Sequence, residues 1–248
     1  MVNKISNVSH TLIINTFEGF YYKDSSKIEE ALKKISESYN ADRLLNISRE
    51  IAKSIRVEIL NESTHIFKPF GDSGSFLVGA DIENYNTGAI HLKESHITFH
   101  TYLEDTLENF LIIRFELHIC SCADENIFLS LPEIFNNSPN FPKKRNSLFP
   151  HLIGIDYLKR GSTLISNHKK TIKNIHNLTH EISDKAFGDK YIFIKKSADK
   201  NNQQNVLIMK EKLIERGLYS LHSNISNDIF TNFLSSLSNE YAESFLNI

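Results

Sequence analysis

The 248-residue sequence predicts an α+β fold, a layered sandwich of a mainly antiparallel sheet with helices packed on one face, plus a helix-rich C-terminal extension. Three observations predict it. Two amphipathic helical segments lie near the amino terminus, alternating segments typical of strands crowd together between residues 56 and 122, and the pattern turns helical again after Gly161. A chain of this length can bury a core as one large domain or as two small ones.

The amino-terminal segment predicts one strand and two helices. The strand covers His10–Tyr22. The first helix begins near Ser26, because Ser26 and Glu29 have the spacing of a capping box and an apolar stripe follows at helical spacing. The second helix covers about Ala41–Ile55, and its apolar residues again fall on one side.

The middle of the sequence predicts strands, because short apolar runs alternate with polar residues. The expected strands are Arg56–Leu60, His65–Phe67, Gly74–Val78, Ala89–Leu92, Ser95–Tyr102 and Phe110–Cys122. Four of the five prolines then fall between residues 131 and 150, which indicates a loop or an irregular entry into a helix.

The last third predicts one more strand at Leu152–Leu158 and then a helical pattern. Short strands are expected within it at Tyr191–Ile194 and Leu218–Leu221. The final helix repeats an apolar residue every four positions, at Ile229, Phe233, Leu237 and Tyr241. We therefore divide the chain into a sandwich core, residues 1–161, and a helix-rich extension packed on it, residues 162–248.

Composition excludes several classes of protein. The net charge of −2 gives no electrostatic footprint for nucleic acid. No apolar run approaches the length of a membrane span or of a signal-peptide core, so we expect no membrane partner and a cytoplasmic location. Cys120 and Cys122 stand two apart on one face of an expected strand, where geometry opposes a disulfide, so free thiols are expected.

The most informative segment is residues 93 to 102, which read Lys-Glu-Ser-His-Ile-Thr-Phe-His-Thr-Tyr. Strand alternation puts Ile97, Phe99 and Thr101 on one face. The other face then carries Thr98 between two histidines, His96 and His100. A strand whose polar face carries two histidines is either exposed to solvent or lines a site.

Three short motifs follow one another from this segment onward: Glu94-Ser95-His96, His100-Thr101-Tyr102-Leu103-Glu104 and Ser121-Cys122-Ala123. Further matches are Tyr39-Asn40-Ala41-Asp42-Arg43-Leu44, Ile155-Asp156-Tyr157 and Arg160-Gly161. In this order and spacing the set resembles the pyruvoyl-dependent S-adenosylmethionine decarboxylase proenzymes, and it favours their longer, enterobacterial-type branch. The resemblance runs from about residue 10 to beyond residue 215.

The resemblance implies a proenzyme that cleaves itself between Glu94 and Ser95 into a β and an α chain. Ser95 would attack the carbonyl of Glu94 in an N-to-O acyl shift, and β-elimination would then leave a pyruvoyl group in place of Ser95. This group would form a Schiff base with S-adenosylmethionine and release CO2, giving the decarboxylated product used for spermidine biosynthesis. Decarboxylation needs such an electron sink, and the sequence has no persuasive Gly-rich phosphate loop for the common alternative, pyridoxal phosphate.

The resemblance also implies roles for five further residues. His100 would transfer a proton during self-processing, and Cys122 would protonate the carbanion left by CO2. Ser73 would lie near the pyruvoyl group and orient it. Phe17 would stack on adenine and Glu18 would accept hydrogen bonds from the ribose hydroxyls. Magnesium activation and a homo-oligomer of αβ pairs are implied as well, without residues that could be assigned to a metal.

Several positions depart from the family pattern. Leu103 replaces a proline, Ala123 replaces a glycine, and His118 stands where relatives tend to carry an acid. In addition, residues five apart on a flat strand lie on opposite faces, so Ser95 and His100 meet only if the chain bends between them.

Two other functions stay open from the sequence. One is the same pyruvoyl chemistry directed at another amino acid, such as ornithine or arginine. The other is a regulatory paralogue that does not cleave itself and acts as a partner subunit. The residues Ser95, His100 and Cys122 favour an enzyme, because a non-catalytic subunit needs none of them.

Overall fold

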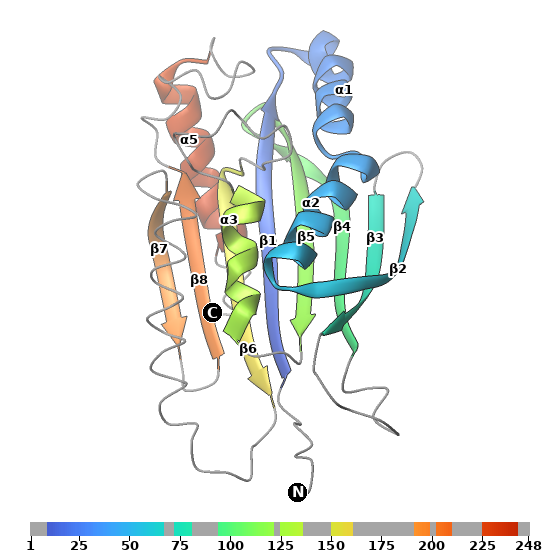
Figure 1. Cartoon of the computed structure of the whole chain (residues 1–248). Helices are drawn as coiled ribbons and strands as arrows, with labels where there is room; N and C mark the ends of the chain where they lie inside the picture. The colour runs from blue at the N-terminus through green and yellow to red at the C-terminus, as the bar shows by residue number, and fades with distance from the viewer. Residues whose placement is uncertain are drawn as a thin grey trace, which may run out of the picture.

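The computed structural model describes residues 9–66, 72–80, 94–121, 125–135, 150–160, 191–198, 202–209 and 225–242. The described strands form one eight-stranded sheet in the order β2-β3-β4-β5-β1-β6-β8-β7, and every neighbouring pair is antiparallel. Figure 1 shows helices α1, α2 and α3 on one face of this sheet. The predicted α+β class with an antiparallel sheet is confirmed.

The amino-terminal elements are β1 (Ser9–Tyr21), the 3-10 turn η1 (Ser25–Lys27), α1 (Ile28–Ser38) and α2 (Ala41–Ser54). The predicted capping box at Ser26 and Glu29 is wrong. The cap is Asp24, at the start of η1, because its carboxylate accepts hydrogen bonds from the N–H and the hydroxyl of Ser26. The capping residue therefore stands two positions before the one that the sequence predicted. The start of α2 is capped by Asn40, whose side chain accepts from the N–H of Arg43 at 2.9 Å.

The first hairpin consists of β2 (Val57–Ile66) and β3 (Asp72–Ala80). The sequence predicted two short strands where β2 is continuous. The register shifts between Ile59 and Asn61, and this bulge interrupts the alternation on which the prediction depended. The expected strand at Ala89–Leu92 lies outside the described residues.

The central hairpin joins β4 (Glu94–Leu107) to β5 (Phe110–Ser121). Glu108 and Asn109 both have positive φ, 49° and 63°, as a tight two-residue turn between strands requires. The hairpin is also linked to the carboxyl-terminal helix, because the Ser236 hydroxyl donates to the Glu108 carboxylate at 3.4 Å.

After this hairpin come η3 (Glu125–Leu129), α3 (Ser130–Phe135), β6 (Leu152–Arg160), β7 (Tyr191–Ala198) and β8 (Asn202–Met209). Pro132 lies in the first turn of α3, where proline is tolerated, so this part of the proline-rich segment is the expected helix entry. Both β7 and β8 join the sheet beyond β6, so the segment after residue 161 contributes strands as well as a helix. The expected strand at Leu218–Leu221 lies outside the described residues.

The last described elements are α5 (Asn227–Leu237) and the π-helical turn η5 (Ser238–Ala242), as the four-residue repeat predicted. They cover the face of the sheet opposite α1 and α2. The Phe233 ring stacks on Phe110 at 3.9 Å between centroids, and Tyr241 lies 4.7 Å from Phe17. On the other face, Tyr39 after α1 meets Phe20 and Phe115.

Gly19 lets α5 approach β1 closely. A Cβ atom at this position would lie 2.5 Å from the tip of the Phe233 ring and 3.0 Å from the Phe110 ring. Both rings are fully buried, so neither can move without displacing its neighbours. We expect Gly19→Ala to lower the free energy of unfolding by about 1–3 kcal/mol, measured by urea denaturation. An unchanged midpoint would show that α5 is not packed as described.

Candidate functional site

The proposed cleavage point lies at the first two residues of β4. In the register of the β3–β4 pair, Glu94 stands opposite Gly79 and Ser95 opposite Val78. The register is regular from Glu94 to Leu103, and the only shift comes after Leu103. The Glu94–Ser95 bond therefore lies in a continuous strand, hydrogen-bonded into the sheet.

This strand separates Ser95 from His100. Position 95 shares a face of β4 with Ile97 and Phe99, which are fully buried under α1, α2 and α3; we call this the helical face of the sheet. Position 100 belongs to the opposite face. At about 3.3 Å per residue, five residues span about 17 Å. The bend that would bring the two residues together is not present, so they do not meet within this chain.

The structure does bring Ser73 and His100 together. They are directly opposite each other in the β3–β4 register, and paired positions of an antiparallel sheet belong to the same face. On the other side of His100, the register partner is Glu116 of β5. One row across three strands thus reads Ser73, His100, Glu116.

The predicted proton donor, Cys122, lies outside the described residues, which stop at Ser121 before resuming at Glu125. Its neighbour Cys120 is described and is a free thiol. Cys120 pairs with His96 on one side and with Thr11 on the other, and the Thr11 hydroxyl donates to its sulfur at 3.6 Å.

Phe17 and Glu18 are not brought to one site. They are successive residues of β1 and point to opposite faces, Phe17 toward Tyr241 of η5 and Glu18 toward Tyr39 after α1. Phe17 is only 2% exposed because Tyr241 covers it. A single bound nucleoside could not contact both side chains in this arrangement.

Glu18 is a buried carboxyl group on the helical face. The Tyr39 hydroxyl donates a hydrogen bond of 2.6 Å to it, and Arg43 supplies a favourable charge nearby. Burial nevertheless dominates and raises the pKa of Glu18 from 4.5 to about 7. The pKa of Tyr39 is raised as well, first by burial and then by the Glu18 charge.

The shifted pKa of Glu18 predicts a dependence of stability on pH. The folded protein holds this proton more tightly than the unfolded chain, so the contribution of Glu18 is most favourable below pH 4.5 and falls as pH rises to about 7. The full change is on the order of 3 kcal/mol. We expect Glu18→Gln to become stabilising relative to wild type as pH rises from 5 to 8, measured by urea denaturation.

The control for this experiment is Glu62→Gln. Glu62 is exposed and bonded to Arg49, and this hydrogen bond lowers its pKa, so its contribution to the pH dependence has the opposite sign. A difference between Glu18→Gln and wild type that does not change with pH would contradict the buried environment of Glu18.

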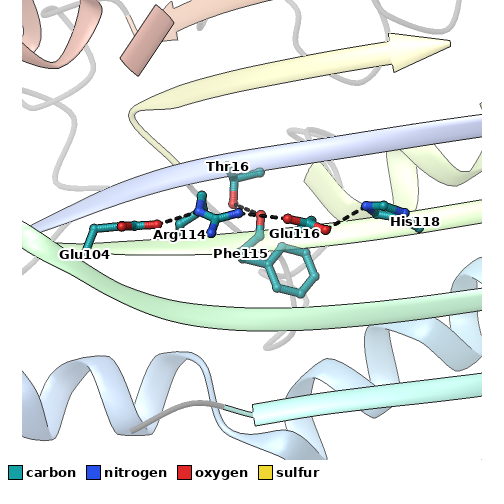
Figure 2. A network of polar contacts seen from close by, with 6 residues as sticks. All are labelled: Thr16, Glu104, Arg114, Phe115, Glu116 and His118. Carbon is teal, nitrogen blue, oxygen red and sulfur yellow. Dashed lines mark hydrogen bonds and ion pairs between the residues drawn. The ribbon is translucent and has the colours of Figure 1, made fainter. Parts of the chain in front are cut away.

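A row of charged residues on β4 and β5 was not among the sequence predictions. Figure 2 shows it as a chain of contacts from Glu104 through Arg114 and Glu116 to His118. The distances are 2.5 Å from Arg114 Nε to Glu104, 2.8 Å from Arg114 Nη1 to Glu116, and 2.7 Å from His118 Nε2 to Glu116. The polar residues at every second position from Arg114 to His118 are the signal that could have found it.

The electrostatics of this row favour its charged forms. The hydrogen bond from His118 is the largest influence on Glu116 and lowers the pKa of Glu116 despite partial burial. Partial burial opposes the charge of Arg114, but the carboxylates of Glu104 and Glu116 raise its pKa overall. Partial burial, followed by the nearby His118, lowers the pKa of His96.

Two kinds of site find no support in the described part of the chain. Its histidine, cysteine and carboxylate side chains form no group of three or more that could hold a metal ion. None of its helices is long and apolar enough to cross a membrane.

Comparison with known proteins gives a consistent set of relatives. No protein-family model matches the sequence. S-adenosylmethionine decarboxylase proenzymes from Clostridium botulinum, Alcanivorax borkumensis and Stenotrophomonas maltophilia are 27%, 26% and 26% identical over 66%, 73% and 72% of the chain. The matched region spans 64%, 66% and 66% of their own lengths.

Among solved structures, an adenosylmethionine decarboxylase from Aquifex aeolicus matches 65% of this chain and 96% of its own. Its identity is 12% and its TM-score 0.30, which is too low to support an argument about the fold.

Proposed function

We propose that this chain, a relative of the S-adenosylmethionine decarboxylase proenzymes, is itself a self-cleaving S-adenosylmethionine decarboxylase, a carboxy-lyase of polyamine synthesis. The sequence match to these proenzymes carries the proposal. The motifs Glu94-Ser95-His96 and His100-Thr101-Tyr102 support it, and the register that pairs Ser73 with His100 adds a polar row to the same strand.

In the proposed self-processing, the Ser95 hydroxyl attacks the carbonyl carbon of Glu94 and the peptide nitrogen leaves as the free amine of residue 95. In the ester formed in this way, β-elimination removes the Cα proton of residue 95 and breaks its Cβ–Oγ bond. This step frees the main-chain carboxylate of Glu94 as the new end of the β chain. The remaining enamine is hydrolysed, with release of ammonia, to a ketone conjugated to the next carbonyl. Serine is required because its oxygen is first the nucleophile and then part of the leaving group.

Residue 95 can form a pyruvoyl group because its hydroxyl directly follows the carbonyl of Glu94 that it would attack. Once formed, the pyruvoyl group supplies the electron sink for decarboxylation. Cys122 donates the proton that replaces CO2, since a thiol with the ordinary cysteine pKa of about 8.5 retains its proton at neutral pH. Ser73 is assigned to orienting this group, but its register partner is His100, so it belongs to the other face from position 95 and can act only if the strand rearranges or a second copy of the chain supplies it.

His100 is assigned to proton transfer during processing. Since it lies on the other face of β4 from position 95, processing needs either a rearrangement of the strand at Glu94–Ser95 or a histidine from a second copy of the chain. The homo-oligomer of αβ pairs, which we also propose, makes the second route available. Magnesium as activator and the cytoplasm as compartment, where thiols such as Cys122 stay reduced, complete the proposal.

For the adenosyl group, Phe17 is the proposed stacking residue. Its ring is covered by Tyr241, so binding of an adenine ring on that side requires η5 to move or the two rings to separate. Glu18 could reach a ribose only if the helical face opened, because it is buried under that face and bonded to Tyr39.

The test is release of CO2 from carboxyl-labelled S-adenosylmethionine by the purified protein, with labelled ornithine and arginine as competing substrates. Release from S-adenosylmethionine alone is the expected result. Release from ornithine or arginine instead would assign the same chemistry to another amino acid. Absence of release from all three, with magnesium present, would contradict the proposed activity.

One structural observation favours a second candidate, a regulatory partner that does not cleave itself. The strand β4 continues without interruption through Glu94 and Ser95 and keeps Ser95 apart from His100. Leu103 and Ala123, which replace a proline and a glycine of the family pattern, also favour a chain that does not cleave itself. An uncleaved chain that raises the decarboxylase activity of a cleaved homologue on mixing would establish this role.

A further inference from the structure

The row of charges on β4 and β5 contains two carboxylates that the proposed reaction does not use, Glu104 and Glu116. Glu116 has both oxygens occupied, Oε2 by Arg114 and Oε1 by His118. The side chains of Glu116, Arg114 and Glu104 are each between 22% and 28% exposed, so the contacts are partly shielded from water. Partial shielding makes charge-assisted contacts stronger than they are on an open surface.

Glu116 is also the direct register partner of His100. The two residues point to the same face, with Cβ atoms about 5 Å apart by the geometry of antiparallel pairs. Among the described residues, the charged or titratable groups that the register places on the same face as Glu116 include His96, His100 and Glu104 on β4, Arg114 and His118 on β5, and Asp156 on β6. Asn15, its partner on β1, is uncharged, and Tyr241 of η5 lies near Arg114 and Glu104.

Arg114 connects Glu116 to His100 by a second route. Its guanidinium lies 4.0 Å from the centre of the Tyr102 ring, and the Tyr102 ring in turn lies 6.1 Å from His100 with 29° between the planes. The imidazole of His100 therefore has Tyr102 along its own strand and Glu116 across the strand pair. Both of these neighbours are fixed by the same arginine.

We propose that Glu116 is a positioning residue for His100: its carboxylate, fixed by Arg114 and His118, holds a negative charge and a defined shape beside the imidazole. This inference rests on the proposed role of His100 in self-processing. It assigns the network in Figure 2 to the orientation of His100 and not to stability alone.

The matched control is Glu104. Its carboxylate bonds the same arginine and is similarly exposed, but it lies four residues from His100 on β4. Glu104→Gln thus removes one negative charge from the network without changing the residue opposite His100. Glu116→Asp keeps the charge on a shorter side chain and serves as the conservative variant.

The experiment measures the rate at which freshly synthesised precursor is cleaved, and the melting temperature of each variant. We expect Glu116→Gln to slow cleavage at least about tenfold, Glu116→Asp to restore most of the rate, and Glu104→Gln to stay within about threefold of wild type. Melting temperatures are expected to agree within about 3 °C.

If Glu104→Gln and Glu116→Gln slowed cleavage equally, Glu116 would have a structural role and the inference would be overturned. The same would follow if the cleavage rate fell only in proportion to the melting temperature. A normal cleavage rate in Glu116→Gln would overturn it too, while leaving the proposed function intact. A wild-type precursor that never cleaves would contradict the self-processing reaction itself, and with it this role for Glu116.

Discussion

Replacement of Ser95 by alanine is expected to leave the protein as one chain of 28.5 kDa with no decarboxylase activity. Alanine has no oxygen to attack the carbonyl of Glu94, so neither the cleavage nor the pyruvoyl group can form. Because both events need the same oxygen, activity should fall by at least about a thousandfold. Denaturing electrophoresis and CO2 release from labelled S-adenosylmethionine measure the two effects on one preparation.

The control for Ser95→Ala is Ser75→Ala on the neighbouring strand β3, where the register pairs Ser75 with Thr98. It removes a hydroxyl from the adjoining strand without touching the cleavage point, and we expect it to cleave normally. A Ser95→Ala protein that still decarboxylates would show that the activity depends on another cofactor.

Replacement of Cys122 by alanine is expected to permit cleavage and to lower the turnover number by about 10²–10⁴-fold, the usual range for a general acid. Water would then have to supply the proton. Without a positioned donor, more of the remaining turnovers should place the proton on the wrong atom, and the protein should lose activity faster. The measurement is CO2 release over time, with the masses of both chains followed in parallel.

Cys120→Ala is the matched control, because Cys120 is a free thiol two positions before Cys122 in the sequence, and its sulfur accepts a long hydrogen bond of 3.6 Å from the Thr11 hydroxyl. Its turnover should stay within about threefold of wild type. If Cys120→Ala lost as much activity as Cys122→Ala, the proton donor would have been assigned to the wrong cysteine.

Strands with strict alternation could be predicted from the sequence, and strands that depend on their partners could not. The predicted Ser95–Tyr102 lies inside β4, since Ile97 and Phe99 are buried and the residues between them are polar. In contrast, β8 begins Asn-Gln-Gln-Asn, residues with no strong preference for strands, and pairing with β6 and β7 decides its conformation.

In the candidate site, too, features that depend on local sequence could be predicted and features that depend on strand pairing could not. The motif residues Glu94, Ser95 and His100 could be found from the sequence because they lie close together in it. The pairing of Ser73 with His100 and of His100 with Glu116 depends on the register between strands, which the lengths of loops and turns decide. Likewise, the contact of Tyr241 with Phe17 joins residues more than 200 positions apart.

The central claim is that the chain cleaves itself between Glu94 and Ser95, and the intact mass of the purified protein under denaturing conditions tests it most directly. The account predicts two chains of about 11 and about 18 kDa, in proportion to the 94 and 154 residues on either side of the bond in a 28.5 kDa precursor. The larger chain should carry a pyruvoyl group and resist sequencing from its amino terminus. A single uncleaved chain of 28.5 kDa would contradict the claim.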